Sequence, residues 1–243
     1  MQRNIDPAGP TINGVLFDKD GTLVDFDGTW IPAYRTAALA LTNGNEARSA
    51  EMLEATGHDP AHATIRHGTL LAVGGISEIA AAWAPYADHP GGEALAVLLD
   101  ETFTRETRRH CRMIDGAEAV LQRLAGAGVS LGVATNDSAG SAAAMFDELR
   151  LTDYFDFVCG CDSGFGRKPD AGMTEAYCRA TGLAPAEIAV VGDNAHDLEM
   201  GRRAGAGLCI GVLSGNGDTH DLTDLADVII DDVGKLEAVL GYG

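Results

Sequence analysis

Two aspartates one residue apart, Asp18 and Asp20, follow a short apolar run at residues 15–17 and precede a Gly-Thr pair. The run is too brief for a helix and is typical of a buried strand that stops at the acids. Parallel α/β sheets bind ligands at the carboxyl ends of their strands, so this position predicts a functional site. Taken alone, D-x-D-G-T also fits a plain acidic turn, because turns favour Asp and Gly.

A second pair of acids, Asp193 and Asp197, follows the apolar residues 188–191. Their spacing of four places both carboxylates on one face at the start of a helix. Acids there also complement the helix dipole, which is the simpler explanation of either one alone. Together with Asp18 and Asp20 they form a set of hard oxygen ligands that suits Mg²⁺.

Two further stretches offer groups that bind anions. Residues 129–134 are an apolar strand that runs into Thr135 and Asn136, where a hydroxyl and main-chain N–H groups at a helix start suit a phosphate, or simply cap the helix. Lys168 is one of only three lysines in the chain, and the proline after it favours an extended conformation. It is either a fixed positive charge in the site or an exposed, solubilising lysine.

The elements that must position these residues change in character along the chain. Between residues 30 and 109 the sequence is rich in alanine and lacks β-branched runs, which predicts helices at residues 32–41, 46–55, 77–83 and 92–109. From Ile114 onward strands and helices alternate with short connections, which predicts a parallel sheet with helices on both faces. We therefore expect an α/β core of residues 1–24 and 110–243, with an all-helical insertion of residues 25–109.

Two other patterns receive a structural interpretation. Residues 25–29 repeat D-x-D-G-T, but no apolar strand leads into this copy, so we expect a tight hairpin or flap there rather than the active copy. His58, His62 and His67 could suggest a metal site, but Pro60 interrupts any shared helical face, so we expect solvated histidines.

The composition limits the partners. A formal net charge of -19 repels phosphodiester backbones, which argues against nucleic acid. No apolar run approaches the roughly 18 residues of a membrane span, and the five scattered cysteines do not suggest a disulfide framework. We expect a cytoplasmic protein, a monomer or homodimer, without a membrane partner.

The order of these motifs, D-x-D-G-T, strand-Thr-Asn, Lys-Pro and G-D-x-x-x-D, resembles the haloacid dehalogenase (HAD) superfamily over residues 12–240. The helical block resembles the C1 cap of that family, and the arrangement is most similar to its phosphoglycolate phosphatase-like members. The resemblance implies a Rossmann-like parallel-sheet core with an inserted helical cap. It also implies a Mg²⁺-dependent phosphatase that acts on a small phosphorylated metabolite such as phosphoglycolate.

Carried over to this sequence, the resemblance implies a role for each motif residue. Asp18 would be the nucleophile that forms an aspartyl-phosphate, and Asp20 the general acid and base whose main-chain carbonyl also binds the metal. The other implied site residues are Thr135 and Asn136 for the phosphoryl oxygens, Lys168 for charge compensation, and Asp193 and Asp197 for Mg²⁺.

Four alternatives to a phosphatase can be weighed, and the last two of them stay open. A dehalogenase is disfavoured because an acid stands two residues after Asp18. A phosphonatase is disfavoured because no lysine lies between Lys19 and Lys168 to form its Schiff base. A sugar-phosphate mutase of the β-phosphoglucomutase type shares all four motifs, and a non-catalytic phosphate-binding protein could use the same scaffold.

Overall fold

The computed structural model of the protein describes residues 11–242, and the chain divides into two compact units. One unit contains the described residues up to Asp25 together with those from Met113 onward, and the other is Phe26–Arg112. The first unit holds the sheet, and the second is mainly helical.

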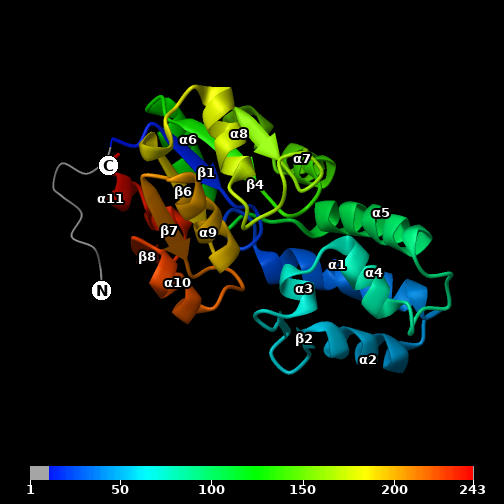
Figure 1. The fold of residues 1–243 in the computed structure, drawn as a ribbon. Coiled ribbons are helices and arrows are strands. Elements are labelled where there is room, and N and C mark those ends of the chain that lie inside the picture. The colour runs from blue at the N-terminus through cyan, green and yellow to red at the C-terminus, as the bar shows by residue number, and fades with distance from the viewer. Residues whose placement is uncertain (1–10, 243) are drawn as a thin grey trace. The chain divides into compact units, whose positions relative to one another are not determined.

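The α/β unit is built on one parallel sheet of six strands in the order β5-β4-β1-β6-β7-β8 (Figure 1). Strand β1 lies between β4 and β6, so that Val15 has Leu131 and Ala189 as its neighbours. The strands are β1 (Gly14–Phe17), β4 (Ser130–Ala134), β5 (Phe157–Cys159), β6 (Ile188–Gly192), β7 (Leu208–Val212) and β8 (Val228–Ile230). Strands β1, β6 and β7 are buried along their whole length, as expected for a parallel sheet covered on both faces.

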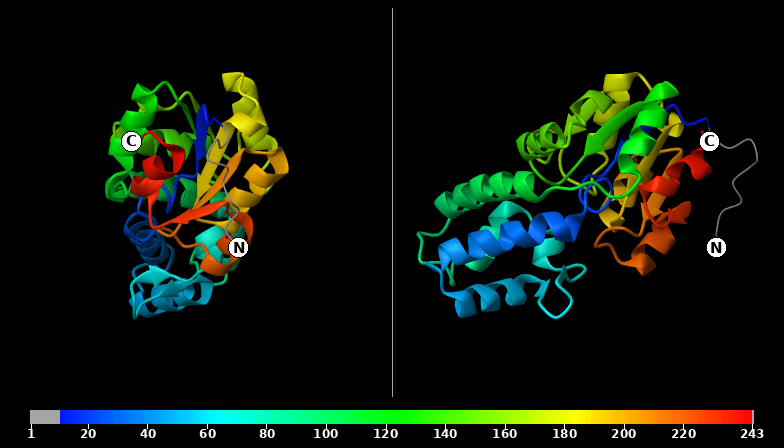
Figure 2. Two further views of the ribbon diagram at one scale, coloured as in Figure 1. Left: turned by 90° about the vertical axis from the view of Figure 1, so that its left-hand side faces the viewer. Right: turned by 180° about the vertical axis from the view of Figure 1, so that it is seen from behind.

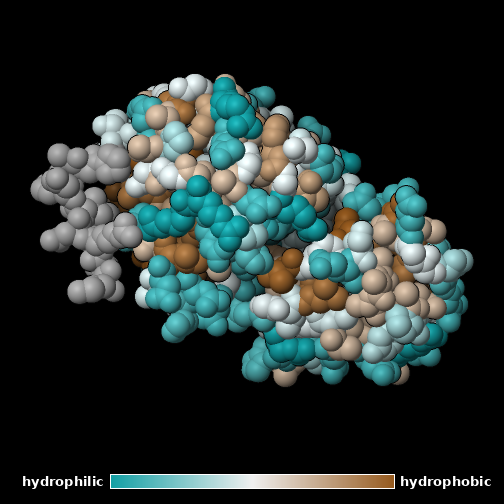
Figure 3. Space-filling view, viewed as in Figure 1, coloured by the Kyte–Doolittle hydropathy of each residue, from teal (hydrophilic) through white to brown (hydrophobic). Residues whose placement is uncertain are grey.

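Helices cover both faces of this sheet, with α6 and α11 on one face and α8 and α9 on the other (Figure 2). The α-helices are α6 (Ala117–Gly126), α7 (Ala139–Glu148), α8 (Gly172–Thr181), α9 (Ala195–Ala204), α10 (Thr219–Leu225) and α11 (Leu236–Leu240). Short 3₁₀ turns lie at η1 (Thr152–Tyr154), η2 (Pro185–Glu187) and η3 (Val233–Lys235). The doubly covered parallel sheet confirms the predicted α/β class. The sequence did not indicate helix α10. Its surface on the face seen in Figure 3 is mostly hydrophilic.

The helical unit is inserted between β1 and β4 and has its own apolar core. Its helices are α1 (Phe26–Leu41), α2 (Glu46–Thr56), α3 (Leu70–Val73), α4 (Ile76–Trp83) and α5 (Glu93–His110), and a short antiparallel pair, β2 (His58–Asp59) and β3 (Thr64–Ile65), follows α2. Four aromatic rings meet at the centre, with Phe103 edge-on to Trp30, Tyr34 and Trp83. This burial stabilises the insertion because large aromatic side chains remove the most apolar surface from water.

One expectation about this region was wrong, and another holds only in part. The second D-x-D-G-T copy does not form a hairpin or flap, because helix α1 begins at Phe26 and buries Phe26 and Trp30 at helical spacing. Within this copy, the Asp27 carboxylate accepts a hydrogen bond of 3.0 Å from the Ile65 N–H, which is a structural contact. Of the three histidines, His62 and His67 are exposed, as expected, whereas His58 is only 5% exposed.

Within the described part of the chain, no helix is both long enough and apolar enough to cross a membrane.

Candidate active site

Three neighbouring strands end in the residues that the sequence singled out. Asp18 follows β1, Thr135 follows β4, and Asp193 follows β6. Because β4, β1 and β6 are adjacent and parallel, their carboxyl ends meet at one edge of the sheet. The main chain of Asp18 continues the pairing with β6, donating a hydrogen bond of 2.8 Å to the Val191 carbonyl oxygen.

Asp18, Asp193 and Asp197 form a compact acidic cluster. One carboxylate oxygen from each lies within 4.8 Å of the others. The side chains of Asp18 and Asp197 keep 11% and 4% of their surface exposed, and Asp193 as a whole residue is 6% exposed. No other cluster of three possible metal ligands of this kind occurs within residues 11–242. Three hard oxygen donors on a nearly buried surface fit a small divalent cation such as Mg²⁺.

Lys168 bridges two members of this cluster. Its ammonium group donates a short hydrogen bond to Asp18 Oδ1 and another of 2.6 Å to Asp197 Oδ1. Its main chain is held by the side chain of Asn136, whose Oδ1 accepts a bond of 2.9 Å from the Lys168 N–H. The side chain of Asn136 therefore positions the lysine loop, a contact that the sequence did not indicate.

Thr135 lies beside this loop with 3% of its surface exposed. Its Oγ1 accepts a hydrogen bond of 3.1 Å from the Asp137 N–H, and its own N–H donates to the Cys159 carbonyl oxygen at 3.0 Å. Because Oγ1 is an acceptor for Asp137, the hydroxyl proton is oriented away from that N–H group. The structure thus brings Thr135, Asn136 and Lys168 to the same strand edge as Asp18.

Burial sets the electrostatics of the cluster. Burial raises the pKa of Asp18 to about 6, with Lys168 opposing the shift. Burial, followed by the charges of Asp18 and Asp197, raises the pKa of Asp193 well above its usual range. Burial alone would lower the pKa of Lys168, but Asp18 and Asp197 outweigh it and raise that pKa. One lysine therefore faces more carboxyl groups than it could compensate if all of them were ionised.

A loop after β7 supports Asp193, and the sequence analysis did not identify it. The Asn216 N–H donates a hydrogen bond of 2.9 Å to Asp193 Oδ2, and Ser214 Oγ donates one of 2.7 Å to the Gly21 carbonyl oxygen. Gly215 and Gly217 allow this approach, because a β-carbon on Gly217 would lie 1.7 Å from the Asp193 carbonyl oxygen. The signal in the sequence is Ser-Gly-Asn-Gly directly after an apolar strand.

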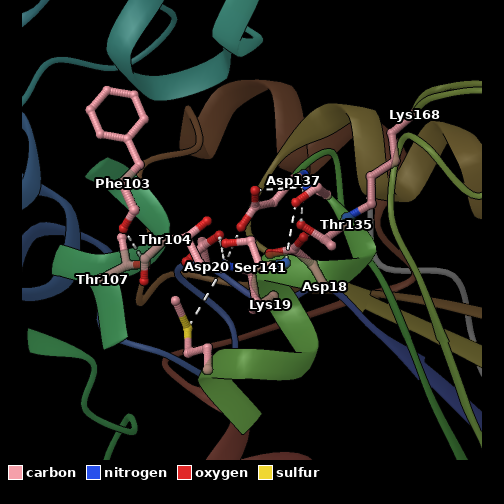
Figure 4. Close-up of polar contacts among 12 residues, drawn as sticks. Asp18, Lys19, Asp20, Phe103, Thr104, Thr107, Thr135, Asp137, Ser141 and Lys168 are labelled. Atoms are coloured by element: carbon pink, nitrogen blue, oxygen red, sulfur yellow. Dashed lines mark hydrogen bonds and ion pairs between the residues drawn. The ribbon is translucent and has the colours of Figure 1, made fainter. Parts of the chain in front are cut away.

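A second lysine, Lys19, contacts the other acid of the first motif. Its Nζ lies 2.7 Å from Asp20 Oδ2 and 3.1 Å from Asp137 Oδ2 (Figure 4). Asp20 is thus brought to the same strand edge as Asp18 but is paired with a different lysine. The sequence analysis assigned no role to Lys19 or Asp137, although the scarcity of lysine in this chain was a usable signal.

Known proteins share this sequence pattern and fold. Residues 12–205 match the family described as haloacid dehalogenase-like hydrolase. A phosphoglycolate phosphatase of Chromobacterium violaceum is 28% identical over 232 residues, which cover 96% of this chain and 98% of the relative. An N-acetylmuramic acid 6-phosphate phosphatase of Pseudomonas putida is 26% identical over 194 residues, 80% of each chain.

Among solved structures, CbbY from Rhodobacter sphaeroides in complex with phosphate superimposes with a TM-score of 0.66. It is 20% identical, and the match covers 93% of this chain and 96% of that one, so it supports the fold alone. This α/β fold, with acids and a lysine gathered at the ends of parallel strands, is that of a hydrolase. The chain belongs to the haloacid dehalogenase-like hydrolase family and is an enzyme of its phosphatase type.

Proposed function

We propose that this enzyme is a Mg²⁺-dependent phosphatase that hydrolyses a small phosphomonoester through an aspartyl-phosphate on Asp18. The observation that carries the proposal is the position of Asp18, whose carboxylate lies at the end of the central strand β1 among Asp193, Asp197 and Lys168. A nucleophilic carboxylate that attacks an anionic phosphate needs positive charge nearby to reduce their repulsion.

The cation site would be formed by the acidic cluster. Asp18, Asp193 and Asp197 would each offer one carboxylate oxygen, and the main-chain carbonyl of Asp20 would add another ligand. The bound Mg²⁺ would supply positive charge that offsets the repulsion between Asp18 and the phosphoryl group. Burial and the charges of Asp18 and Asp197 raise the pKa of Asp193, which disfavours its ionised form. A bound cation would favour that ionised form again, so the raised pKa supports a cation site here.

The chain's own residues would perform the bond changes. A carboxylate oxygen of Asp18 forms a bond to phosphorus while the ester P–O bond breaks, and the leaving oxygen takes the proton of Asp20. Asp20 then accepts a proton from a water molecule whose oxygen attacks the phosphorus, releasing phosphate and restoring the Asp18 carboxylate. Burial raises the pKa of Asp20, with Lys19 opposing the shift, and a raised pKa favours the protonated form that the first step requires.

Thr135 and Lys168 would bind the transferred group. The Thr135 hydroxyl and the Asn136 N–H would donate to the phosphoryl oxygens, and Lys168 would neutralise charge on Asp18 and the phosphate as it does on Asp18 and Asp197 here.

The relatives support a small phosphorylated metabolite as the substrate. One is named for phosphoglycolate and another for N-acetylmuramic acid 6-phosphate, both phosphomonoesters of small molecules. Phosphoglycolate is our first candidate because the relative named for it matches nearly the whole chain. A panel of phosphorylated metabolites compared by kcat/KM tests this choice, and equal low rates on all of them would argue against a dedicated substrate.

An Asp18→Asn variant tests the chemistry. We expect hydrolysis of p-nitrophenyl phosphate in Mg²⁺ to fall by at least about 1000-fold, because an amide is not a nucleophile. Borohydride reduction of quenched parent enzyme should convert Asp18 to homoserine, as expected of an acyl phosphate. Asp27→Asn is the matched control, because it makes the same change in the second D-x-D-G-T copy, where the side chain caps Ile65. An Asp18→Asn enzyme as active as the parent would refute the proposal.

A further inference from the structure

Lys19 is the most completely buried charged side chain beside the proposed nucleophile, with 0% of its surface exposed. Three segments enclose its ammonium group. Asp20 is the next residue along the same loop, and Asp137 follows β4 (Figure 4). The Met145 sulfur on α7 lies 3.8 Å from the ammonium nitrogen. A lysine pays a large desolvation cost at such a place, so its presence requires an explanation.

The two buried lysines divide the acids of the site between them. Lys168 contacts Asp18 and Asp197, whereas Lys19 contacts Asp20 and Asp137. The acid proposed as nucleophile and the acid proposed as proton donor are therefore held by different cations, although they are separated by a single residue.

The main chain around Asp20 is fixed independently of Lys19's side chain. The Gly21 N–H donates to the Val24 carbonyl oxygen at 2.7 Å, and the N–H groups of Leu23 and Val24 donate to the Lys19 carbonyl oxygen at 2.9 and 3.0 Å. With the backbone closed in this way, the Asp20 side-chain torsions are the freedom that remains, and the Lys19 contact restricts them.

Asp137 is itself held in place on its other side. Its Oδ1 accepts a hydrogen bond of 2.7 Å from the Ser138 N–H, while its Oδ2 lies 3.1 Å from the Lys19 ammonium. Both of its oxygens are thus engaged, so it provides a rigid support for the lysine rather than a mobile counter-ion.

Stability alone does not explain this arrangement. Replacing a buried ion pair by apolar side chains of similar volume is often neutral or stabilising, because desolvation cancels the attraction. An unbranched apolar residue at position 19 would pack against Met145, which already contacts the ammonium group. A requirement on the position of the Asp20 carboxyl group accounts for the retained charges.

We propose that Lys19, supported by Asp137, is a positioning residue that holds the Asp20 carboxyl group in line with the leaving oxygen of the substrate. The inference rests on the proposed phosphatase function. In the first step the P–O ester bond breaks, its electron pair stays on the leaving oxygen, and the Asp20 proton passes to that oxygen. Lys19 keeps its protons throughout and acts only through the placement of Asp20.

The leaving group distinguishes this role from a general structural one. Protonation matters greatly for an alkoxide leaving group such as that of phosphoglycolate and little for p-nitrophenolate, which leaves readily without a proton. Because kcat/KM reports the steps up to the first irreversible one, it isolates cleavage of the ester from the later hydrolysis of the aspartyl-phosphate.

The test compares Lys19→Met with a double variant, Lys19→Met with Asp137→Asn. The double variant removes the lysine together with one charge that would otherwise stay buried, which guards against misfolding. In both, we expect kcat/KM for phosphoglycolate to fall by about 100-fold, and the loss for p-nitrophenyl phosphate to be at least about tenfold smaller. Lys235→Met, the same substitution at the remaining and exposed lysine, is the matched control.

Magnesium binding provides a readout that does not depend on turnover. Lys19 contacts Asp20 and Asp137 rather than a carboxylate of the acidic cluster, so calorimetric titration with Mg²⁺ should give a dissociation constant close to that of the parent. Equal losses on both substrates, or no loss on either, would overturn the proposed role. Such a result would leave the phosphatase proposal standing, provided that the parent is active and Asp18→Asn is not. A parent inactive on both esters would overturn both.

Discussion

Replacing Gly217 by alanine should weaken the metal site although it replaces none of the proposed ligands. Gly217 belongs to the loop after β7 that lies against Asp193. Its φ angle lies outside the left-handed region, so alanine suits the backbone itself, and only the space around the new methyl group is at issue.

The displacement can be worked out from the contact. The β-carbon would lie 1.7 Å from the Asp193 carbonyl oxygen, whereas real β-carbon contacts are essentially never under 3.0 Å. The two atoms must therefore separate by at least 1.3 Å, the difference between these distances. If the loop moves, Asp193 Oδ2 loses its 2.9 Å bond from the Asn216 N–H, and if Asp193 moves, the acidic cluster loses its geometry.

Either adjustment should lower the affinity for the cation. A hydrogen bond to a charged acceptor contributes about 1.5–3 kcal/mol, and groups that orient metal ligands typically affect affinity by about 10–100-fold. We therefore expect the Mg²⁺ dissociation constant of Gly217→Ala to rise about 10–100-fold, with activity partly restored at high Mg²⁺.

Calorimetric titration with Mg²⁺ and the dependence of kcat/KM on Mg²⁺ concentration measure the effect. Gly126→Ala is the matched control, because a β-carbon there would meet nothing within 4 Å at the end of α6. A dissociation constant for Gly217→Ala within about twofold of the parent, with unchanged circular dichroism, would refute the idea that this loop orients Asp193.

Three further predictions concern the charges of the site and the core of the helical unit. Lys168→Met should lower kcat/KM for phosphomonoesters by about 100-fold or more, because the ammonium group contacts Asp18 and lies 2.6 Å from Asp197 Oδ1. Retained activity in a steady-state assay would contradict the role of Lys168. In EDTA the melting temperature should fall as the pH rises from about 4 to about 6, because the folded state raises the pKa of Asp18 from 3.8 to about 6. The stability that protonated Asp18 contributes is fully present below the unfolded pKa and is lost as the pH rises through the folded pKa. Added Mg²⁺ should reduce this fall, and a flat profile in EDTA would argue against the buried cluster. In the helical unit, Trp83→Ala should lower the free energy of unfolding in urea by about 3–5 kcal/mol, because the ring is fully buried and its Nε1 donates to Thr56. Val97 is 53% exposed, so Val97→Ala should change the free energy of unfolding by less than about 0.5 kcal/mol.

The local sequence determined the strands and the type of chemistry. Apolar residues 15–17 and 188–191 are short and continuous because both faces of a parallel sheet are covered, and this pattern indicated β1 and β6 directly. The acids that follow them could be identified from type and spacing because a strand end is a local feature of the chain. Helix α10 was missed because Thr219–Leu225 is mostly polar and buries only Leu222.

The tertiary structure decided which residues meet. The two D-x-D-G-T copies share one pattern, and locally only the apolar run before the first copy tells them apart. It is the pairing of β1 with β4 and β6 that brings Asp18 to Asp193 and Lys168, while residues 26–29 enter a helix. The pairing of Lys19 with Asp137 joins residues more than a hundred positions apart, and the support of Asp193 by Asn216 depends on a loop that only the sheet order places there. Sequence periodicity indicates which face of a helix or strand is buried, but it does not indicate which distant segment of the chain packs against that face.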